Sequence, residues 1–442
     1  MRNVMVPSII FSVPAEKWGE MAVNVNKLIS LEEAQSLILA TVSPLATEAV
    51  QLSDASGRIL AEDVRASKDE PSIPLAAMDG YGVQSMDVEF ATPQKGVVLP
   101  VVGAVSAGDN RHHELNRGEA VKVMTGAPLP VGADAVVPME MTEGVSEGIR
   151  ITTPVAQGDY IVPAGAEFHQ NQQLLSSGAV LRPNELTILA ALGYTMVTVR
   201  KKPEVAVLAT GTELVEVGTR LGPGQTFASN LHTVAHLVKR CGGKTTSLDI
   251  AGDNLDNLVG YIQRGMKADV VVTTGGTGKG DKDLVSAAIT TLNGDLCFRG
   301  IAMTPGKQTL FAKLGGTLFF GLPGRPTATY IAFEQLVRPA LFRMLGLSPA
   351  LLPEITARLS RTIQVKGKIL SFLFCRLIFG PEGPQVESLR SGTRGILTEM
   401  LAANGLLKVP PGIERLEQGE LVRVQPLDLG LEGLSYFSAL QQ

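Results

Sequence analysis

Ala268-Asp-Val-Val-Val-Thr-Thr-Gly-Gly-Thr-Gly-Lys-Gly-Asp-Lys-Asp-Leu284 is the stretch of sequence that indicates the fold. It begins as a β-branched run typical of a buried strand, continues through glycines and acids, and ends where a helical apolar pattern starts. Glycines let backbone amides approach an oxyanion, and a helix N-terminus adds a favourable dipole. The stretch therefore predicts a strand, an anion-binding loop and a helix.

Three interpretations of this loop compete. A Walker A motif requires Ser or Thr directly after its Gly-Lys pair, whereas Gly280 follows Lys279, which argues against a P-loop NTPase. A dinucleotide fingerprint is weak, because its glycine spacing, its position opening a helix and its later ribose-binding acid are not all met. An ordinary βα turn with solvated charges stays open from this loop alone.

Length and composition limit the class of protein. The 442 residues exceed one typical core and suggest about three domains, and 45% hydrophobic residues describe a globular chain. A net charge of −4 argues against broad nucleic-acid binding. Cys241, Cys297 and Cys375 lie far apart without a CxxC, so they indicate reduced intracellular thiols, not a disulfide framework or zinc cluster.

The N-terminal segment does not have the form of a targeting signal. Its apolar patch, residues 9–13, is interrupted by Pro14 before it reaches signal-peptide length. Elsewhere no run approaches the roughly 18 to 20 uncharged apolar residues that span a bilayer. We therefore expect a cytoplasmic protein with no membrane association.

The middle of the chain alternates strands and helices. Strands are expected at 205–209, 245–250 and 269–273, with helices at 233–238, 255–262 and 284–292, which implies a parallel sheet with right-handed crossovers. Before it, residues 65–171 are rich in Gly, Pro and Val with few helical stripes, which suggests an inserted β domain between helical segments. After a helix at 327–345, expected to kink at Pro339, strand patterns return and indicate a small terminal β-barrel. Those strands are predicted at 355–365, 370–379, 406–409 and 421–424.

Acidic residues follow three strands of the expected sheet. Ligands gather beyond the carboxyl ends of parallel strands, and Glu213, Asp253 and Asp283 each lie in a loop there. Carboxylates supply hard oxygen ligands for Mg²⁺, and a bound cation would hold an anionic substrate that bare carboxylates repel. The alternative is that an acid only caps the following helix. We predict that the three residues form a metal site.

Three further motifs are less specific. In the inserted domain, residues 77–81 and 124–130 have the small residues and single polar group of turns whose backbone approaches another group, although either alone is merely a turn. His232 and His236 have helical i, i+4 spacing, but no glutamate follows the first histidine as in HExxH, which disfavours a zinc site.

Taken together and in order, these motifs resemble the molybdopterin molybdenumtransferase family, which includes MoeA and the gephyrin E domain. The resemblance runs from about residue 24 to 427. The family is known for an inserted β domain, a pterin-binding α/β domain and a C-terminal barrel. The resemblance is carried by Met78-Asp-Gly-Tyr81, Met124-Thr-Gly-Ala-Pro128, Thr210-Gly-x-Glu213-Leu214, Thr274-Gly-Gly276, Pro305-Gly-Lys307 and Gly321-Leu-Pro-Gly324-x-Pro326.

The resemblance implies four domains in a homodimer. The expected fold class is multidomain α/β plus β, with a doubly wound, MogA-like parallel sheet, an inserted β domain, a helical stalk and a small C-terminal β-barrel. Each active site is expected between the third and fourth domains of one subunit and the inserted domain of the other. The expected boundaries are an extension at 1–23, a stalk at 24–64 and 172–202, the inserted domain at 65–171, the α/β domain at 203–348, the barrel at 349–427 and a tail at 428–442.

The implied reaction inserts molybdenum from molybdate into adenylylated molybdopterin and releases AMP, assisted by Mg²⁺. By motif, Glu213, Asp253 and Asp283 would surround the nucleotide and metal, and the amides of Gly275 and Gly276 would hold phosphate. Asp79, Thr125 and Glu167 would approach from the partner subunit. The other expected binding residues are Thr210, Gly211, Lys279, Pro305, Gly306, Lys307, Arg376 and Arg394.

The chain departs from the family pattern around its basic residues. Gly300 and Thr304 stand where the family often has two lysines, and the usual Asn of the Leu-Pro-Gly-Asn-Pro turn is Arg325. Glu167 replaces an Asp and keeps its charge. Arg394 stands in a turn that usually carries serine, near the expected molybdate site. Arg299, Lys307 and the loop lysines Lys279 and Lys282 are candidates to supply the missing charge.

Three functions follow from these observations. The leading hypothesis is a molybdenum-inserting transferase supplied with its pterin by the adenylylating enzyme of the same pathway. A binding-class alternative is a catalytically impaired carrier of the pterin nucleotide or finished cofactor, supported by the missing lysines at 300 and 304. A third is a hydrolase of simpler adenylylated pyrophosphates. The choice between molybdate and tungstate is left open.

Overall fold

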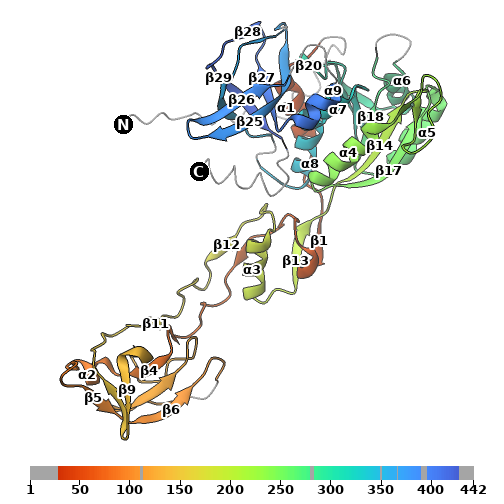
Figure 1. The fold of residues 1–442 in the computed structure, drawn as a ribbon. Coiled ribbons are helices and arrows are strands. Elements are labelled where there is room, and N and C mark those ends of the chain that lie inside the picture. Colours follow the sequence, from red (N-terminus) through yellow and green to blue (C-terminus); the bar gives the residue numbers. More distant parts are fainter. Residues whose placement is uncertain are drawn as a thin grey trace. The chain divides into compact units, whose positions relative to one another are not determined.

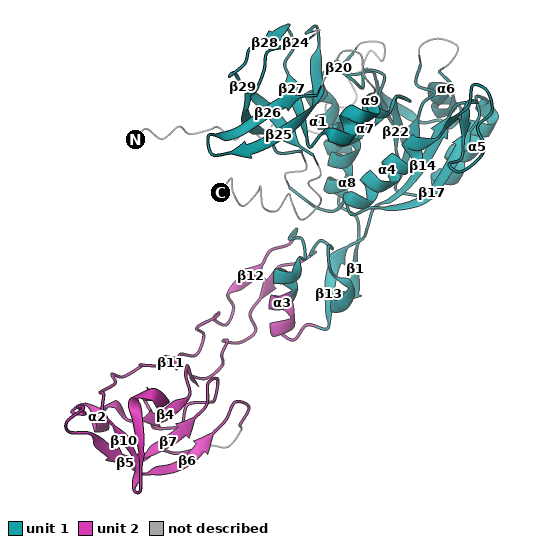
Figure 2. Cartoon of the chain, viewed as in Figure 1, with its two compact units in different colours: residues 1–61, 178–186, 195–442 teal, residues 62–177, 187–194 magenta. Residues whose placement is uncertain are grey.

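The computed structural model describes residues 28–109, 113–278, 283–348, 351–365, 367–389 and 396–427. Lys279, Lys282 and Arg394 lie outside these ranges, as do the expected N-terminal extension and C-terminal tail. The chain forms two compact units (Figure 2). Unit 1 comprises residues 1–61, 178–186 and 195–442, and unit 2 comprises residues 62–177 and 187–194.

Unit 1 contains the parallel sheet that the sequence predicts (Figure 1). Its four parallel strands lie in the order β17-β14-β18-β22, and two antiparallel strands, β21 and β19, extend it at one edge. Helix α4 lies between β14 and β17 in the chain, α5 connects β17 to β18, and α6 connects β18 to β19. The bounds are β14 Glu204–Thr210, α4 Ser229–Arg240, β17 Lys244–Ala251, α5 Leu255–Gly265, β18 Val270–Thr274, α6 Leu284–Thr291, β19 Asp295–Arg299, β21 Leu310–Leu314 and β22 Thr317–Leu322.

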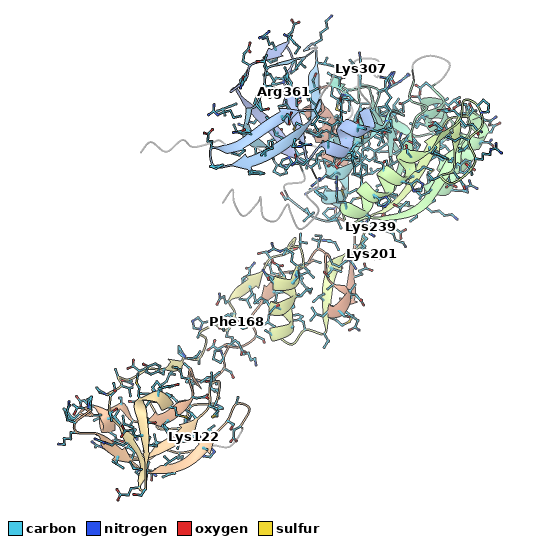
Figure 3. All side chains as sticks on the ribbon, viewed as in Figure 1. Lys122, Phe168, Lys201, Lys239, Lys307 and Arg361 are labelled. Carbon is cyan, nitrogen blue, oxygen red and sulfur yellow. The ribbon has the colours of Figure 1, made fainter. Side chains whose placement is uncertain are left out.

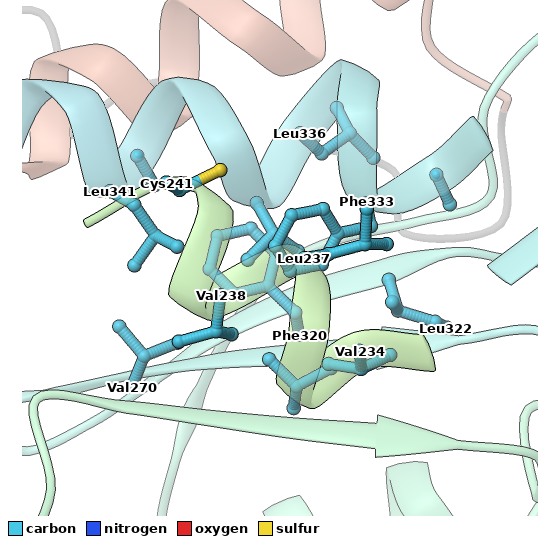
Figure 4. Close-up of a cluster of buried hydrophobic side chains, with 14 of the residues drawn as sticks. Val234, Leu237, Val238, Cys241, Val270, Phe320, Leu322, Phe333, Leu336 and Leu341 are labelled. Carbon is cyan, nitrogen blue, oxygen red and sulfur yellow. The ribbon is translucent and has the colours of Figure 1, made fainter. Parts of the chain in front are cut away.

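The sheet is buried on both faces, which is why its strands read as continuous apolar runs. On β14, Val205 and Val207 pack into one core with α4, whereas Ala206 and Leu208 pack into another with α5 and α6. This alternation follows the two-residue period of a strand. Figure 4 shows the first core, with side chains of α4 between the sheet and the helical segment that carries Phe333, Leu336 and Leu341. The doubly wound arrangement is confirmed.

The helix predicted at 327–345 is interrupted. It consists of α7 (Pro326–Ala332), a π-helical turn η4 (Phe333–Val337) and α8 (Arg338–Met344). Pro339 sits in the first turn of α8, where its missing N–H is tolerated. The wider turn before it places Glu334 in the core, where the residue is 1% exposed.

Glu334 is paired with two arginines. Its carboxylate forms ion pairs with Arg240 of α4 and with Arg338, the latter at 2.9 Å. Arg338 is also 1% exposed. The buried guanidinium of Arg338 and the partly buried one of Arg240 therefore share one buried carboxylate, which joins α4 to η4 and α8.

The C-terminal region of unit 1 forms a closed five-stranded barrel, as predicted. The strands follow the order β25-β26-β23-β29-β27, and β27 pairs with β25 to close the ring. Strand β26 has no counterpart in the prediction. The bounds are β23 Ile355–Leu359, β24 Ile363–Gln364, β25 Leu370–Gly380, β26 Gly383–Ser388, α9 Ile396–Ala402, β27 Gly405–Val409, β28 Arg415–Leu416 and β29 Leu421–Pro426.

Unit 2 is mostly β and contains the predicted inserted domain. It has a four-stranded sheet, β6-β7-β4-β8, and a three-stranded sheet, β5-β10-β9. The bounds are β2 Val64–Arg65, β3 Leu75–Ala76, β4 Gly80–Val83, α2 Ser85–Val88, β5 Val97–Leu99, β6 Val101–Val105, β7 Ala120–Val123, β8 Ala135–Pro138, η3 Met139–Met141, β9 Thr142–Val145, β10 Gly148–Ile151, β11 Ile161–Val162 and β12 Gln173–Leu175.

The segments expected to form a stalk are divided between the units. The capping box of Ser30 and Glu33 is present at the start of α1 (Leu31–Thr41), and this helix buries Leu31 and Ile38 in the core that contains α8. The other elements there are β1 (Thr47–Gln51), η2 (Leu52–Asp54), α3 (Pro183–Ala191) and β13 (Met196–Arg200), with β1 paired to β13. The exact domain boundaries stay a prediction.

No helix in the described part of the chain is long and apolar enough to cross a membrane.

Candidate functional site

A cavity of about 660 Å³ opens at the carboxyl ends of the parallel strands. The loops after β14, β17, β18 and β22 all contribute to its lining, as do α4 and the strand pair β15 (Leu214–Val215) and β16 (Thr226–Phe227). Six of the residues singled out in the sequence line this first cavity: Thr210, Gly211, Glu213, Asp253, Gly275 and Gly276. Parallel topology brings them together, since the ends of adjacent strands meet at one edge.

The glycine loop lies close against β14. Gly275 has φ +91°, and a Cβ on it would lie 2.6 Å from the carbonyl oxygen of Thr210. Gly276 has φ +65°, and a Cβ there would lie 2.7 Å from Oγ1 of the same threonine. Left-handed backbone and close approach both require glycine at these positions.

The expectation that both glycine amides hold phosphate needs correction. The amide of Gly275 donates to the carbonyl of Leu322 at 2.9 Å, so it is used in joining the loop to β22. Among the described residues, no backbone carbonyl accepts from the amide of Gly276. The Gly276 amide therefore stays a candidate anion donor, and that of Gly275 does not.

Two side-chain oxygens at this cavity are buried without a hydrogen-bond partner among the described residues. They are Oγ1 of Thr210, a residue 6% exposed, and Oδ1 of Asn230 on α4. Nδ2 of Asn230 donates to the carbonyl of Gly324 at 2.7 Å, which fixes the amide orientation. Buried polar atoms are ordinarily satisfied, so these two favour a polar ligand in the cavity.

Two of the three predicted metal-binding acids lie at this cavity. Glu213 and Asp253 are exposed and line it, and Oδ2 of Asp253 accepts weakly from the amide and hydroxyl of Thr212 at 3.4 and 3.3 Å.

Asp283, the third predicted acid, is not among the lining residues. It is the N-cap of α6, where its Oδ1 accepts from the Ser286 amide at 3.1 Å. Although no well-aligned hydrogen bond reaches its Oδ2, the guanidinium of Arg299 forms an ion pair with that atom. The helix-capping alternative therefore describes Asp283.

The described residues do not include a group of three or more His, Cys, Asp or Glu side chains arranged to hold a metal. Mg²⁺ in substrate sites is ordinarily bound by one or two carboxylates together with substrate phosphates and water. Glu213 and Asp253 fit that pattern as two carboxylates in the lining of the first cavity. Mg²⁺ binding by this pair stays a prediction.

A second cavity, of about 670 Å³, lies beside the first and is lined from both the α/β region and the barrel strand β25. Predicted residues Pro305, Gly306 and Lys307 line this cavity and not the first one. They follow β20 (Met303–Thr304), and Lys307 is exposed and labelled in Figure 3. Gln308, Gly324 and Arg325 line both cavities, so the two spaces adjoin.

Of the basic residues expected at the site, Arg299, Lys307 and Arg376 lie in the described part of the chain, and one of these three lines a cavity. Arg299 is committed to Asp283 and to the carbonyl of Gly278. Arg376, exposed on β25, lines neither cavity. Lys307 does line the second cavity. Thr304 lines it as well, whereas Gly300 does not.

In unit 2, the structure brings Asp79 and Thr125 together. Asp79 precedes β4 and Thr125 follows β7, and Gly80 pairs with Val123 across these antiparallel strands. Oδ1 of Asp79 accepts from both the amide and the hydroxyl of Thr125 at 2.8 Å. The hydrogen bond from the Thr125 amide, and after it the one from the Thr125 hydroxyl, lower the pKa of Asp79 below its ordinary value of 3.8. Asp79 is therefore anionic at neutral pH.

Glu167, also predicted, lies in the turn after β11, where its amide donates to the carbonyl of Glu70. No described contact joins its carboxylate to Asp79 or Thr125.

Removing the hydroxyl of Thr125 is expected to raise the pKa of Asp79. In Thr125→Val the hydrogen bond from the residue 125 amide remains, so the pKa of Asp79 should rise but stay below 3.8. A carboxylate with a lowered pKa stabilises the fold above its unfolded-state pKa, and that contribution is lost as pH falls through the folded-state value. A ¹³C NMR titration of the Asp79 carboxyl tests this. Thr142→Val is the control, because its hydroxyl donates to the Met139 carbonyl; an unchanged Asp79 titration in Thr125→Val would contradict the prediction.

Several lining residues carry no sequence signal that identified them. Asn230 lies on a helix recognised only by its apolar stripe, and Gln308 directly follows the Pro-Gly-Lys motif. Arg325 was identified as a departure within a motif but not as a site residue. Gln308 and Arg325 could have been predicted as site residues, because they lie next to or within recognised motifs.

Comparisons with known proteins identify relatives of this chain along most of its length. Residues 29–193 match the family model of the MoeA N-terminal region (domain I and II), residues 206–343 that of a probable molybdopterin binding domain, and residues 356–427 that of the MoeA C-terminal region (domain IV). A molybdopterin molybdenumtransferase of Staphylococcus aureus is 30% identical over 405 residues, covering 91% of this chain and 97% of its own. A Staphylococcus epidermidis protein of that name is 29% identical over the same length.

Solved structures show the same likeness. A molybdopterin biosynthesis MoeA protein from Pyrococcus horikoshii superposes with a TM-score of 0.81 at 33% identity, covering 90% of this chain and 99% of that one. A second MoeA structure from that organism gives a TM-score of 0.76 at 28% identity, covering 90% of this chain and all of the other.

Proposed function

The chain belongs to the molybdopterin molybdenumtransferase (MoeA) family, and on this premise we propose that it inserts molybdenum into adenylylated molybdopterin with release of AMP. The observation that carries the proposal is the pair of adjoining cavities, about 660 and 670 Å³, at the carboxyl edge of the sheet. Each has the size of an ordinary small-molecule site. Together they suit a ligand with a nucleotide part and a second part that meets molybdate.

In the first cavity, the chain's own groups bind the anionic link of the substrate. The Gly276 amide and the Thr210 hydroxyl donate to phosphate oxygens, and the unpaired Oδ1 of Asn230 accepts from a ligand N–H or O–H. Glu213 and Asp253 would hold Mg²⁺. When bound there, Mg²⁺ supplies charge that favours departure of AMP.

In the second cavity, Lys307 supplies positive charge for an incoming molybdate. Thr304 and Ser371 add hydroxyl groups to the same lining. The cavity is walled by β25 of the barrel and by the start of α7, so the barrel helps to enclose it.

We also propose a homodimer. In it, Asp79, Thr125 and Glu167 of the partner subunit would complete the site, as the family resemblance implies. The anionic state of Asp79 suits a group that orients a donor or a cation. Delivery of the pterin by the adenylylating enzyme of the same pathway, and a cytoplasmic location, belong to this proposal and stay predictions.

The proposal is tested by incubating the purified full chain with adenylylated molybdopterin, molybdate and Mg²⁺. We expect AMP release and formation of molybdenum cofactor above a no-protein control, both reduced by Glu213→Gln. Glu216→Gln is the matched control, since Glu216 is exposed but lines neither cavity. Binding of the pterin nucleotide without AMP release would contradict the proposal and favour the carrier alternative.

A further inference from the structure

The two adjoining cavities have few charged lining residues. In the first, the described charged residues are Glu213, Asp253 and Arg325. In the second, they are Lys307, Arg325 and Glu399. Among the described residues that line the first cavity, Arg325 thus carries the one positive charge. An anionic ligand there faces two carboxylates, and Arg325 is the described side chain of the lining that can offset their repulsion.

The backbone at Arg325 is held firmly. The carbonyl of Arg325 accepts from the amide of Thr329 at 2.9 Å and from its hydroxyl at 3.2 Å. The neighbouring Gly324 carbonyl accepts from Asn230. The residue is the N-cap of α7, and Pro326 begins the helix. The position from which the side chain starts is therefore fixed between the two cavities.

The guanidinium of Arg325, by contrast, is uncommitted within the described part of the chain. No described residue forms a hydrogen bond or ion pair with it, and the residue is exposed. The comparison within this region is Arg299, whose guanidinium is taken up by Asp283 and Gly278. Arg325 is thus an available cation whose backbone is fixed at the boundary of both spaces.

We infer that Arg325 binds an oxyanion at the junction of the two cavities and supplies positive charge that the chain lacks at positions 300 and 304. The inference rests on the proposed function and adds a binding residue to it. The oxyanion is either a phosphate of the pterin nucleotide or free tetrahedral molybdate. A guanidinium presents a planar fork of N–H donors that matches two oxygens of either group, which a lysine ammonium does not.

The inference is tested on the full chain with Arg325→Gln, Arg325→Lys and a control, Arg343→Gln. Arg343 is an exposed arginine of α8 that lines neither cavity. One arm measures AMP binding by calorimetry, and the other measures how AMP release from adenylylated molybdopterin depends on molybdate concentration. Charged hydrogen bonds of this kind correspond to a loss of about 10- to 100-fold. We expect that loss in Arg325→Gln, a smaller one in Arg325→Lys and none in Arg343→Gln.

The two arms distinguish the sources of the oxyanion. Weaker AMP binding alone assigns Arg325 to the nucleotide phosphate, and a higher half-saturating molybdate concentration alone assigns it to molybdate; loss in both assigns it to the junction of the two. If Arg325→Gln matches the unaltered chain in both arms, the inference is overturned while the proposed function stands. If the unaltered chain binds AMP but releases none from adenylylated molybdopterin, the proposed function is contradicted. The AMP-binding measurement then still decides the role of Arg325. An unaltered chain that neither binds nor releases AMP contradicts both.

Discussion

Gly275→Ala is expected to lower kcat/KM for AMP release by at least about 30-fold. A left-handed backbone costs a residue with a Cβ about 1–2 kcal/mol, and forcing extra atoms into a packed site costs about 1–3 kcal/mol. Here the new methyl group would lie 2.6 Å from the carbonyl oxygen of Thr210, a main-chain atom that cannot rotate away. A total of about 2–5 kcal/mol corresponds to a factor of at least about 30 if the loop must recover its shape to bind substrate.

The experiment is steady-state AMP release, with Gly218→Ala as the matched control. Gly218 has φ +92°, close to the +91° of Gly275, but a Cβ on it would meet no atom within 4 Å. The control therefore carries the conformational cost without the contact, and it lies outside both cavities. Equal losses in the two variants would mean that close approach to Thr210 is unimportant, and full activity in Gly275→Ala would mean that the glycine loop takes no part in the site.

The sheet was predictable because its pattern is local. Residues 270–274 form a β-branched run, and the two-residue period of β14 directs Val205 and Ala206 to opposite cores. Once the strands are known to be parallel, their carboxyl ends must share one edge. The convergence of Glu213, Asp253 and Gly276 on one cavity follows from these two facts and requires no knowledge of distant contacts.

The partner that each side chain or amide of the site binds was not predictable, because these partners lie in other elements of the chain. Asp283 is paired with Arg299, which lies on the strand after the next helix, and the Gly275 amide is taken by Leu322. Arg376 is a binding residue that the family resemblance implies, but its place on β25 leaves it outside both cavities. Motif position indicates where the chain passes the site, and tertiary pairing decides which donors and charges remain available there.

Glu334→Gln is expected to lower the free energy of unfolding of unit 1 by about 3–5 kcal/mol. Glu334 is 1% exposed and its carboxylate serves both Arg240 and Arg338. The amide keeps the volume but removes the charge, so the buried guanidinium of Arg338 and the partly buried one of Arg240 lose their counter-charge, and breaking a buried pair in this way is costly. For a unit of this size the melting temperature should fall by about 4–8 °C, measured by circular dichroism or calorimetry.

Glu417→Gln provides the comparison, because Glu417 pairs with Arg415 at 2.6 Å but 60% of its side chain is exposed. Water and salt screen such an exposed pair, so it contributes little to stability and this variant should melt close to the unaltered chain. Similar melting of both variants would mean that the buried charges are compensated by other contacts.

The loss of the Glu334 carboxylate should also affect the first cavity. Arg240 lies on α4 together with Asn230, and η4 continues the helix whose N-cap is Arg325. Without the carboxylate that joins α4 to η4, the two walls of the first cavity lose their common support, and nucleotide binding should weaken below the melting temperature as well.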